Sequence, residues 1–154
     1  MEAPNYNEAT DAAAAVTSNF FNIHEVGRVT IATIEASTIR ERQAMRLREE
    51  LLGMVQSSRG LLAVCMRDVE YITSSFLAAL VEISGKCAKA GGRLVLYQVQ
   101  PKIQSDMRAC GAVKHLRIAS SLGEASAMVM ESQARAVARG SGRGLLARLF
   151  KGAA

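Results

Sequence analysis

Three consecutive hydroxyl side chains, Thr73, Ser74 and Ser75, are the residues of this sequence best suited to chemistry. They follow residues 68–72 and directly precede an apolar-periodic stretch that starts at Phe76. A hydroxyl at a helix start can cap the unpaired backbone amides there. The same amides and the helix dipole favour an anion, such as a phosphate carried by one of the hydroxyls. The spacing alone leaves both interpretations open, a plain N-cap and a phosphate acceptor.

Other kinds of chemistry lack the residues they need. His24 and His115 are the only histidines, and neither lies within metal-ligand spacing of a cysteine or of the other, so we expect no metal site. Cys65, Cys87 and Cys110 form no CxxC pair, and we expect each to be a small buried hydrophobic residue in a reducing compartment, the cytoplasm. No nucleophile and base can be paired and no cofactor motif occurs, so the sequence predicts a protein that is not an enzyme and holds no cofactor.

The positive charge of the chain is concentrated near its end. The 154 residues carry a formal net charge of +5. The segment from residue 132 onward accounts for +5 and the first 18 residues for −3, which leaves about +3 for the body between them. We therefore expect no strongly cationic face on the folded domain and no direct contact with nucleic acid. No apolar run approaches the ~18 residues that span a bilayer, so no membrane span is expected.

The elements around the three hydroxyls follow from hydrophobic periodicity. Residues 28–34, 61–66 and 94–99 have the pattern of strands, and 116–119 that of an edge strand. Helical patterns cover residues 44–55 and 76–90, a third helix starts at Pro101, and a fourth follows the capping-box spacing of Ser121 and Glu124. The sequence predicts an α/β domain over residues 19–138, with a small mixed or parallel sheet of four to five strands and about four helices. A disordered acidic leader (1–18) and a flexible basic tail (139–154) are expected to flank it.

The helical periodicity also predicts which side chains face the sheet. In the helix over 76–90, the inward face is expected to carry Leu77, Leu80, Val81, Ser84 and Cys87. Phe76, in the first turn, is then predicted to be a partly exposed contact residue. In the third helix, Ile103, Met107 and Cys110 are expected to be buried.

Three segments together resemble a known family. They are DVEYITSSFLAAL at 68–80, AGGRLVL at 90–96, and the stretch from Pro101 to CGAV at 110–113. The pattern is similar to that of the STAS family, the sulfate transporter and anti-sigma factor antagonist domain, over residues ~20 to 130. The resemblance implies a small sheet with about four helices. Thr73 stands where the family usually has Asp, and Phe76 where it has Gly.

The resemblance implies a regulatory protein that catalyses no reaction and is switched by phosphorylation. Ser74 matches the serine that anti-sigma factor antagonists present for phosphorylation, with Ser75 and Thr73 as alternates. The partner would be an anti-sigma factor that is an ATP-binding serine kinase, contacted through Thr73, Ser74, Ser75 and Phe76, with the chain as a monomer or weak homodimer. The alternative is a STAS module that is never phosphorylated and uses the same helix edge to bind another regulatory protein or a small anion.

Overall fold

The computed structural model describes residues 20–135, so the predicted leader 1–18 and tail 139–154 lie outside the described residues. Seven strands, four helices and one short 3₁₀ helix make up this part of the chain. In chain order they are β1 (Phe21–Val26), β2 (Val29–Ile34), β3 (Thr38–Ile39), α2 (Glu41–Ser58), β4 (Leu61–Cys65), β5 (Tyr71–Ile72), α3 (Ser74–Lys89), β6 (Arg93–Tyr97), α4 (Pro101–Ala109), η1 (Ala112–Lys114), β7 (Arg117–Ala119) and a last helix over 122–135.

The main sheet has five strands in the order β1-β2-β4-β6-β7. β1 and β2 pair antiparallel, whereas β2, β4, β6 and β7 are parallel, so the sheet is mixed as predicted. The prediction missed β1, because only Phe21 and Ile23 of this edge strand are even partly buried and the apolar signal is weak. The predicted α/β class, strand number and helix number are confirmed.

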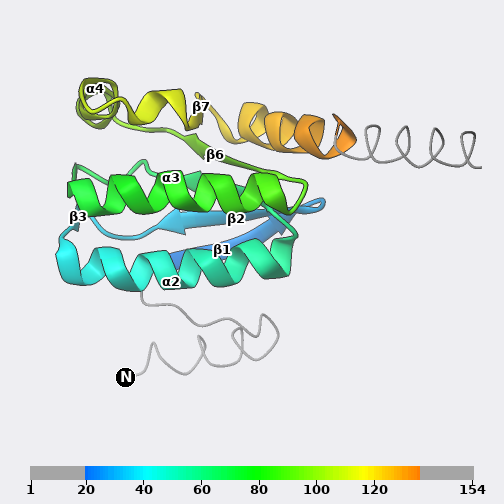
Figure 1. Ribbon diagram of the computed structural model, residues 1–154, viewed down its shortest axis with the longest axis horizontal. Coiled ribbons are helices and arrows are strands. Elements are labelled where there is room, and N and C mark those ends of the chain that lie inside the picture. The colour runs from blue at the N-terminus through cyan, green and yellow to red at the C-terminus, as the bar shows by residue number, and fades with distance from the viewer. Residues whose placement is uncertain (1–19, 136–154) are drawn as a thin grey trace, which may run out of the picture.

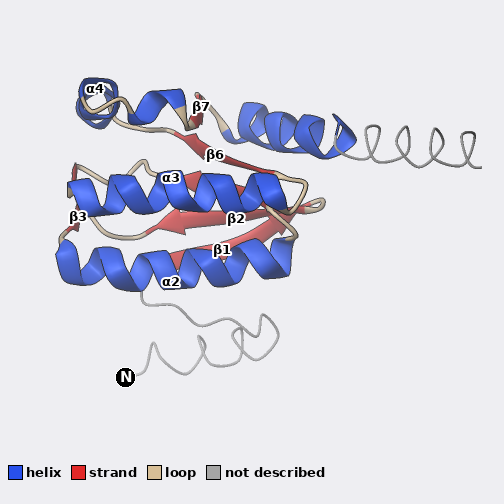
Figure 2. Ribbon diagram, viewed as in Figure 1, coloured by secondary structure: helices blue, strands red, loops and turns tan. Residues whose placement is uncertain are grey.

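Helices cover both faces of this sheet. Figure 1 shows α2 and α3 lying side by side across one face, and Figure 2 shows the same view by element type. On that face Leu62, Val64, Leu94 and Leu96 pack with buried residues of α2 and α3. On the opposite face Ala63, Cys65, Val95 and Tyr97 pack with Ala125 and Val129 of helix 122–135. The apolar runs of β4 and β6 follow from this burial on both sides.

The face of α3 that meets the sheet lies about one residue away from the prediction. The residues with no exposed surface are Phe76, Leu80, Ile83 and Cys87, at the spacing of one helical stripe. Leu80 and Cys87 were predicted there and Leu77 is buried, but Val81 and Ser84 are only half-buried. The helix begins at Ser74 with Thr73 as its N-cap, as the hydroxyls predicted, but Phe76 occupies the first inward position.

Two smaller predictions in the second half of the chain are corrected in detail. Ile103 and Met107 of α4 are buried as expected, but Cys110 is exposed because it follows the last residue of that helix as its C-cap. Ser121 caps helix 122–135 by accepting the N–H of Glu124 at 3.2 Å. The Glu124 carboxylate accepts from the N–H and hydroxyl of Ser120 rather than from Ser121, which lowers the pKa of Glu124. None of the helices within residues 20–135 is long and apolar enough to cross a membrane.

Candidate functional site

The amino ends of α2 and α3 lie next to each other because two short strands precede them. β3 and β5 form a separate parallel pair in which Thr38 is opposite Tyr71 and Ile39 is opposite Ile72. The next residue on each strand is the N-cap of the following helix, Arg40 for α2 and Thr73 for α3. Parallel strands that end together therefore start both helices at the same edge of the domain.

The three consecutive hydroxyls at the start of α3 have different surroundings. Thr73 is the N-cap, and its Oγ1 accepts a hydrogen bond from the N–H of Phe76 at 3.4 Å. The Ser75 hydroxyl donates to a carboxylate oxygen of Glu41, the first residue of α2, at 2.6 Å. Ser74 is exposed, and its hydroxyl has no hydrogen-bond partner among residues 20–135. The first turn of α3 thus leaves one of its three hydroxyls available to a partner.

The prediction that Phe76 is an exposed contact residue is wrong. Its side chain has no exposed surface and is among the largest fully buried side chains of the core. Phe76 is the third residue of α3, so the cap at Thr73 directs its ring under the helix toward the sheet. The residue therefore holds the start of α3 in place and presents no apolar surface there.

Two charged side chains at the start of α2, Arg40 and Glu41, lie at the same edge of the domain as Ser74. The Arg40 guanidinium lies over the Tyr71 ring, 5.9 Å from its centre, and Tyr71 is 45% exposed. Glu41 is engaged with the Ser75 hydroxyl, so one negative charge already lies beside the start of α3. The sequence did not single out Arg40, Glu41 or Tyr71, because no local spacing relates them to Ser74 and only the pairing of β3 with β5 brings them together.

A hollow of about 350 Å³ opens beside Ser74. One wall belongs to α3, with Ser74, Leu77, Ala78 and Val81, and the opposite wall to the segment after α4, including Cys110 and His115. Ser74 is at its rim, and most of the lining is apolar. Cys110 and His115, which the sequence analysis set aside, belong to this wall, and nothing in the sequence marks them as neighbours of Ser74.

A bidentate ion pair ties α3 to α2 farther along both helices. Nε and Nη2 of Arg48 donate to the two carboxylate oxygens of Glu82, each at 2.7 Å. The hydrogen bonds to Arg48 lower the pKa of Glu82, and the same contacts raise the pKa of Arg48. Both side chains remain more than a third exposed, so the pair orients the two helices more than it stabilises them.

The cysteines do not form a second site. Cys65 and Cys87 are buried, and burial raises the pKa of Cys87 to about 12, which keeps its thiol protonated and unreactive. Cys110 is exposed, so the prediction of three buried cysteines holds for only two. In the described part of the chain, no group of three or more His, Cys, Asp or Glu side chains could hold a metal ion.

The family model of the STAS domain matches residues 21–125, which covers nearly all of the described fold. The chain belongs to the STAS domain family. Residues 68–80, whose pattern resembled the family, form the stretch from the loop after β4 through β5 into α3. The exposed Ser74 therefore lies at the helix start of a STAS domain.

Solved structures show the same fold at low sequence identity. An anti-sigma factor antagonist STAS domain protein from Planctomyces limnophilus has a TM-score of 0.64 at 19% identity, covering 73% of this chain and 100% of its own. An anti-sigma factor antagonist from Mycobacterium paratuberculosis has a TM-score of 0.64 at 17% identity, covering 75% of this chain and 99% of its own. The phosphorylated form of the Bacillus cell fate determinant SpoIIAA has a TM-score of 0.52 at 14% identity, covering 68% of this chain and 95% of its own. No curated protein sequence matches this STAS domain chain.

Proposed function

We propose that this STAS domain protein is an anti-sigma factor antagonist that binds a serine-kinase anti-sigma factor at the start of α3 and is switched by phosphorylation of Ser74. One observation carries the proposal. Of the three hydroxyls at this helix start, Thr73 and Ser75 are engaged with Phe76 and Glu41, and Ser74 is free and exposed. A kinase needs an accessible hydroxyl, and this arrangement favours Ser74 over its two neighbours.

The position of Ser74 also suits a phosphate once it is attached. Ser74 is the first residue of a 16-residue helix, where the dipole and the unpaired backbone amides stabilise negative charge. A phosphoserine adds about −1.5 to −2 charges at neutral pH. The carboxylate of Glu41 already lies at this edge, so the modified surface becomes strongly acidic. A partner that fits the unmodified surface would then lose affinity, since it would face this charge and have to desolvate it.

The relatives in fold support a regulatory role with a protein partner. Several are anti-sigma factor antagonists, and the Bacillus protein SpoIIAA has been solved in unphosphorylated and phosphorylated forms. We accordingly assign this chain to transcription regulation through protein binding, with no catalysis or cofactor of its own and no direct contact with nucleic acid. Action in the cytoplasm as a monomer or weak homodimer is part of the same proposal.

A second candidate, a STAS binding module that is never phosphorylated, is favoured by one observation. The Ser75–Glu41 hydrogen bond joins α2 to α3 at the same edge, so the surface has a defined shape without any phosphate. In that case Ser74 contacts the partner as an ordinary polar side chain.

Phosphate transfer from the partner kinase distinguishes the two candidates. The full chain is incubated with ATP and the serine-kinase anti-sigma factor of its own genome, and the tryptic peptide over residues 68–86 is analysed by mass spectrometry. We expect one phosphate on Ser74, retained in Ser75→Ala and lost in Ser74→Ala. Stable binding to the kinase without phosphate on this peptide would instead support the second candidate. Modification of Ser75 with Ser74 untouched would overturn the assignment of the acceptor.

A further inference from the structure

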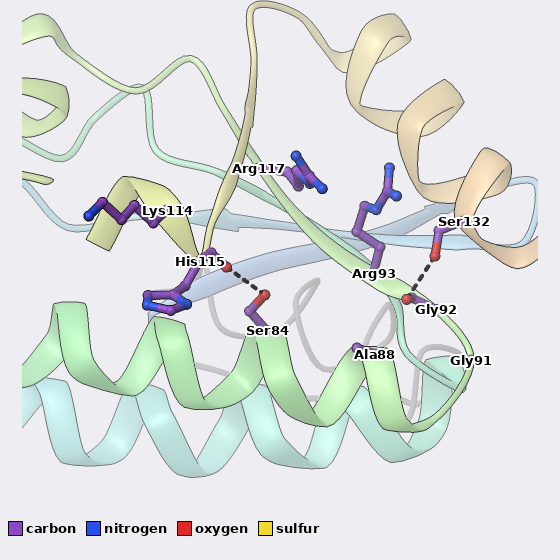
Figure 3. Close-up of a pocket in the computed structure, with 9 residues that line it drawn as sticks. All are labelled: Ser84, Ala88, Gly91, Gly92, Arg93, Lys114, His115, Arg117 and Ser132. Carbon is purple, nitrogen blue, oxygen red and sulfur yellow. Dashed lines mark hydrogen bonds between the residues drawn. The ribbon is translucent and has the colours of Figure 1, made fainter. Parts of the chain in front are cut away.

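A second hollow, of about 310 Å³, lies at the other end of α3 (Figure 3). It is bounded by the last turns of α3, by the amino ends of β6 and β7, and by helix 122–135. Arg93, Lys114 and Arg117 are among its lining residues, and no carboxylate is. This concentration of positive charge is absent from the hollow beside Ser74.

Strand register places two of these cations on the same face of the sheet. Val95 of β6 is paired with Arg117 of β7. Arg93 precedes Val95 by two residues, and side chains two apart on a strand point to the same face. Figure 3 shows the side chains of Arg93 and Arg117 on the side of their strands that faces away from α3, whereas the Lys114 side chain points away from both.

The positive charge of the pair is only partly compensated. Arg93 donates to the Met128 carbonyl at 3.2 Å and approaches Glu131 at 3.8 Å, but Glu131 is shared with Arg135 at 3.7 Å. Arg117 is exposed and has no carboxylate partner within the described ranges. Burial and the charges of Arg117 and Arg135 lower the pKa of Arg93. A bound anion would offset this repulsion between the cations around Arg93.

Hydrogen bonds hold the frame of the hollow. The Ser132 hydroxyl donates to the Gly92 carbonyl at 2.8 Å, which fixes helix 122–135 against the turn between α3 and β6. The Ser84 hydroxyl donates to the His115 carbonyl at 3.0 Å, which fixes α3 against the segment before β7. The arginines therefore project from a scaffold whose parts are joined across the hollow, as a preformed ligand site requires.

We propose that this hollow binds a phosphate dianion through the guanidinium groups of Arg93 and Arg117, either as the free ion or as the phosphate group of a small phosphate ester. The planar guanidinium fork matches the oxygens of a phosphate in a bidentate geometry. Two guanidinium groups balance a charge of about −2. The volume is near the lower end of small-molecule sites, ~300–1,000 Å³, and accommodates one phosphate group with a modest substituent. Arg93 and Arg117 are not part of the hollow beside Ser74, although both hollows share His115, and the site does not depend on the function proposed for Ser74.

Titration of the full chain with inorganic phosphate, followed by NMR of the arginine Nε–H groups, tests the proposal. A parallel titration with sodium chloride at matched ionic strength controls for screening, and one with adenosine monophosphate tests a phosphate ester. We expect saturable shifts of Arg93 and Arg117 with inorganic phosphate, with adenosine monophosphate, or with both. The tighter of the two ligands identifies the source of the phosphate. Shifts no larger than those with chloride, for both ligands, would overturn the site.

Matched variants separate a specific site from general charge. Arg117→Gln removes an exposed charge from an edge strand and should weaken phosphate binding at least tenfold with an unchanged melting temperature. Arg46→Gln, the same change on the exposed surface of α2, should leave the affinity unchanged. Arg93→Lys keeps the charge and loses the fork, and should also weaken binding. Equal affinity of Arg117→Gln and the wild type, or an equal loss in Arg46→Gln, would contradict the proposal.

Discussion

The two ends of α3 are held in different ways and present different surfaces. The amino end is held from below by the buried ring of Phe76 and at its edge by Thr73, and it exposes one free hydroxyl beside a largely apolar hollow. The carboxyl end is held by backbone contacts around the turn into β6, and it faces a hollow lined by arginines. One helix thus joins an edge with an exposed hydroxyl to a hollow lined by arginines.

This difference is the reason why we propose two binding surfaces on one helix. A protein partner needs an exposed rim and side chains that it can fit, as around Ser74. A small anion needs several charged donors around one preformed space, and Arg93 and Arg117 both line the same hollow. Because the two ends have different anchors, changes at one end should alter one surface and spare the other. The predictions below test this separation.

The largest expected effect is the loss of the anchor at the amino end. Phe76→Ala removes a fully buried ring and should lower the free energy of unfolding by ~3–5 kcal/mol, as core Phe-to-Ala changes do. Urea denaturation measures this loss, with Ser74→Ala, two residues away and exposed, as the control that should change little. A loss below ~1 kcal/mol would mean that the ring does not anchor the helix.

The anchor at the carboxyl end is a close approach of two backbones. A Cβ on Gly92 would overlap the carbonyl of Gly60, and that carbonyl also accepts the N–H of Arg93 at 2.8 Å. Gly92→Ala should therefore destabilise the fold by about 3 kcal/mol. Gly85→Ala is the matched control, because its Cβ meets nothing within 4 Å on an exposed helical turn. That substitution should raise the free energy of unfolding by up to ~1 kcal/mol. A change of the same sign in both variants would show that the contact with Gly60 is not what makes Gly92 necessary.

Charge at Ser74 should affect partner binding and leave the basic pocket unaffected. Ser74→Asp is expected to weaken binding to the anti-sigma partner by ~2 kcal/mol or more, whereas Ser74→Ala keeps binding and blocks switching. Isothermal titration with the partner measures the first effect, and phosphate titration of Ser74→Asp should match the wild type. Equal partner affinities of Ser74→Asp, Ser74→Ala and the wild type would remove Ser74 from the mechanism.

The smallest effect concerns the ion pair midway along α3. The pKa of Glu82 is lowered in the fold, so its contribution is present when the carboxylate is ionised and is lost as the pH falls below 4.5, its ordinary value. Glu82→Gln should therefore show a slightly smaller fall in the urea midpoint between neutral and acidic pH than the wild type. Glu35→Gln, at an exposed carboxylate after β2, should keep the wild-type pH dependence. A wild-type pH dependence in Glu82→Gln would show that the pair contributes nothing.

Local patterns in the sequence were enough to predict the α/β class, the central strands and the placement of the hydroxyls at a helix start. Apolar periodicity and capping preferences depend on neighbours within a few turns, so a single sequence carries them. The same patterns could not settle the rotation of α3. The inward face lies about one residue from the predicted one, and this places Phe76, predicted to be exposed, in the core.

The pairing of strands far apart in the sequence determined which other residues join each candidate site. Glu41 meets Ser75 only because β3 pairs with β5, and Arg93 and Arg117 line one hollow only because β6 pairs with β7. The net charge of the domain body, about +3, did not indicate the arginines of the second hollow, because a net charge says nothing about where the charges lie. Residues 24 to 34 positions apart are placed at one site by strand register and helix packing, and these depend on the whole core rather than on the local sequence.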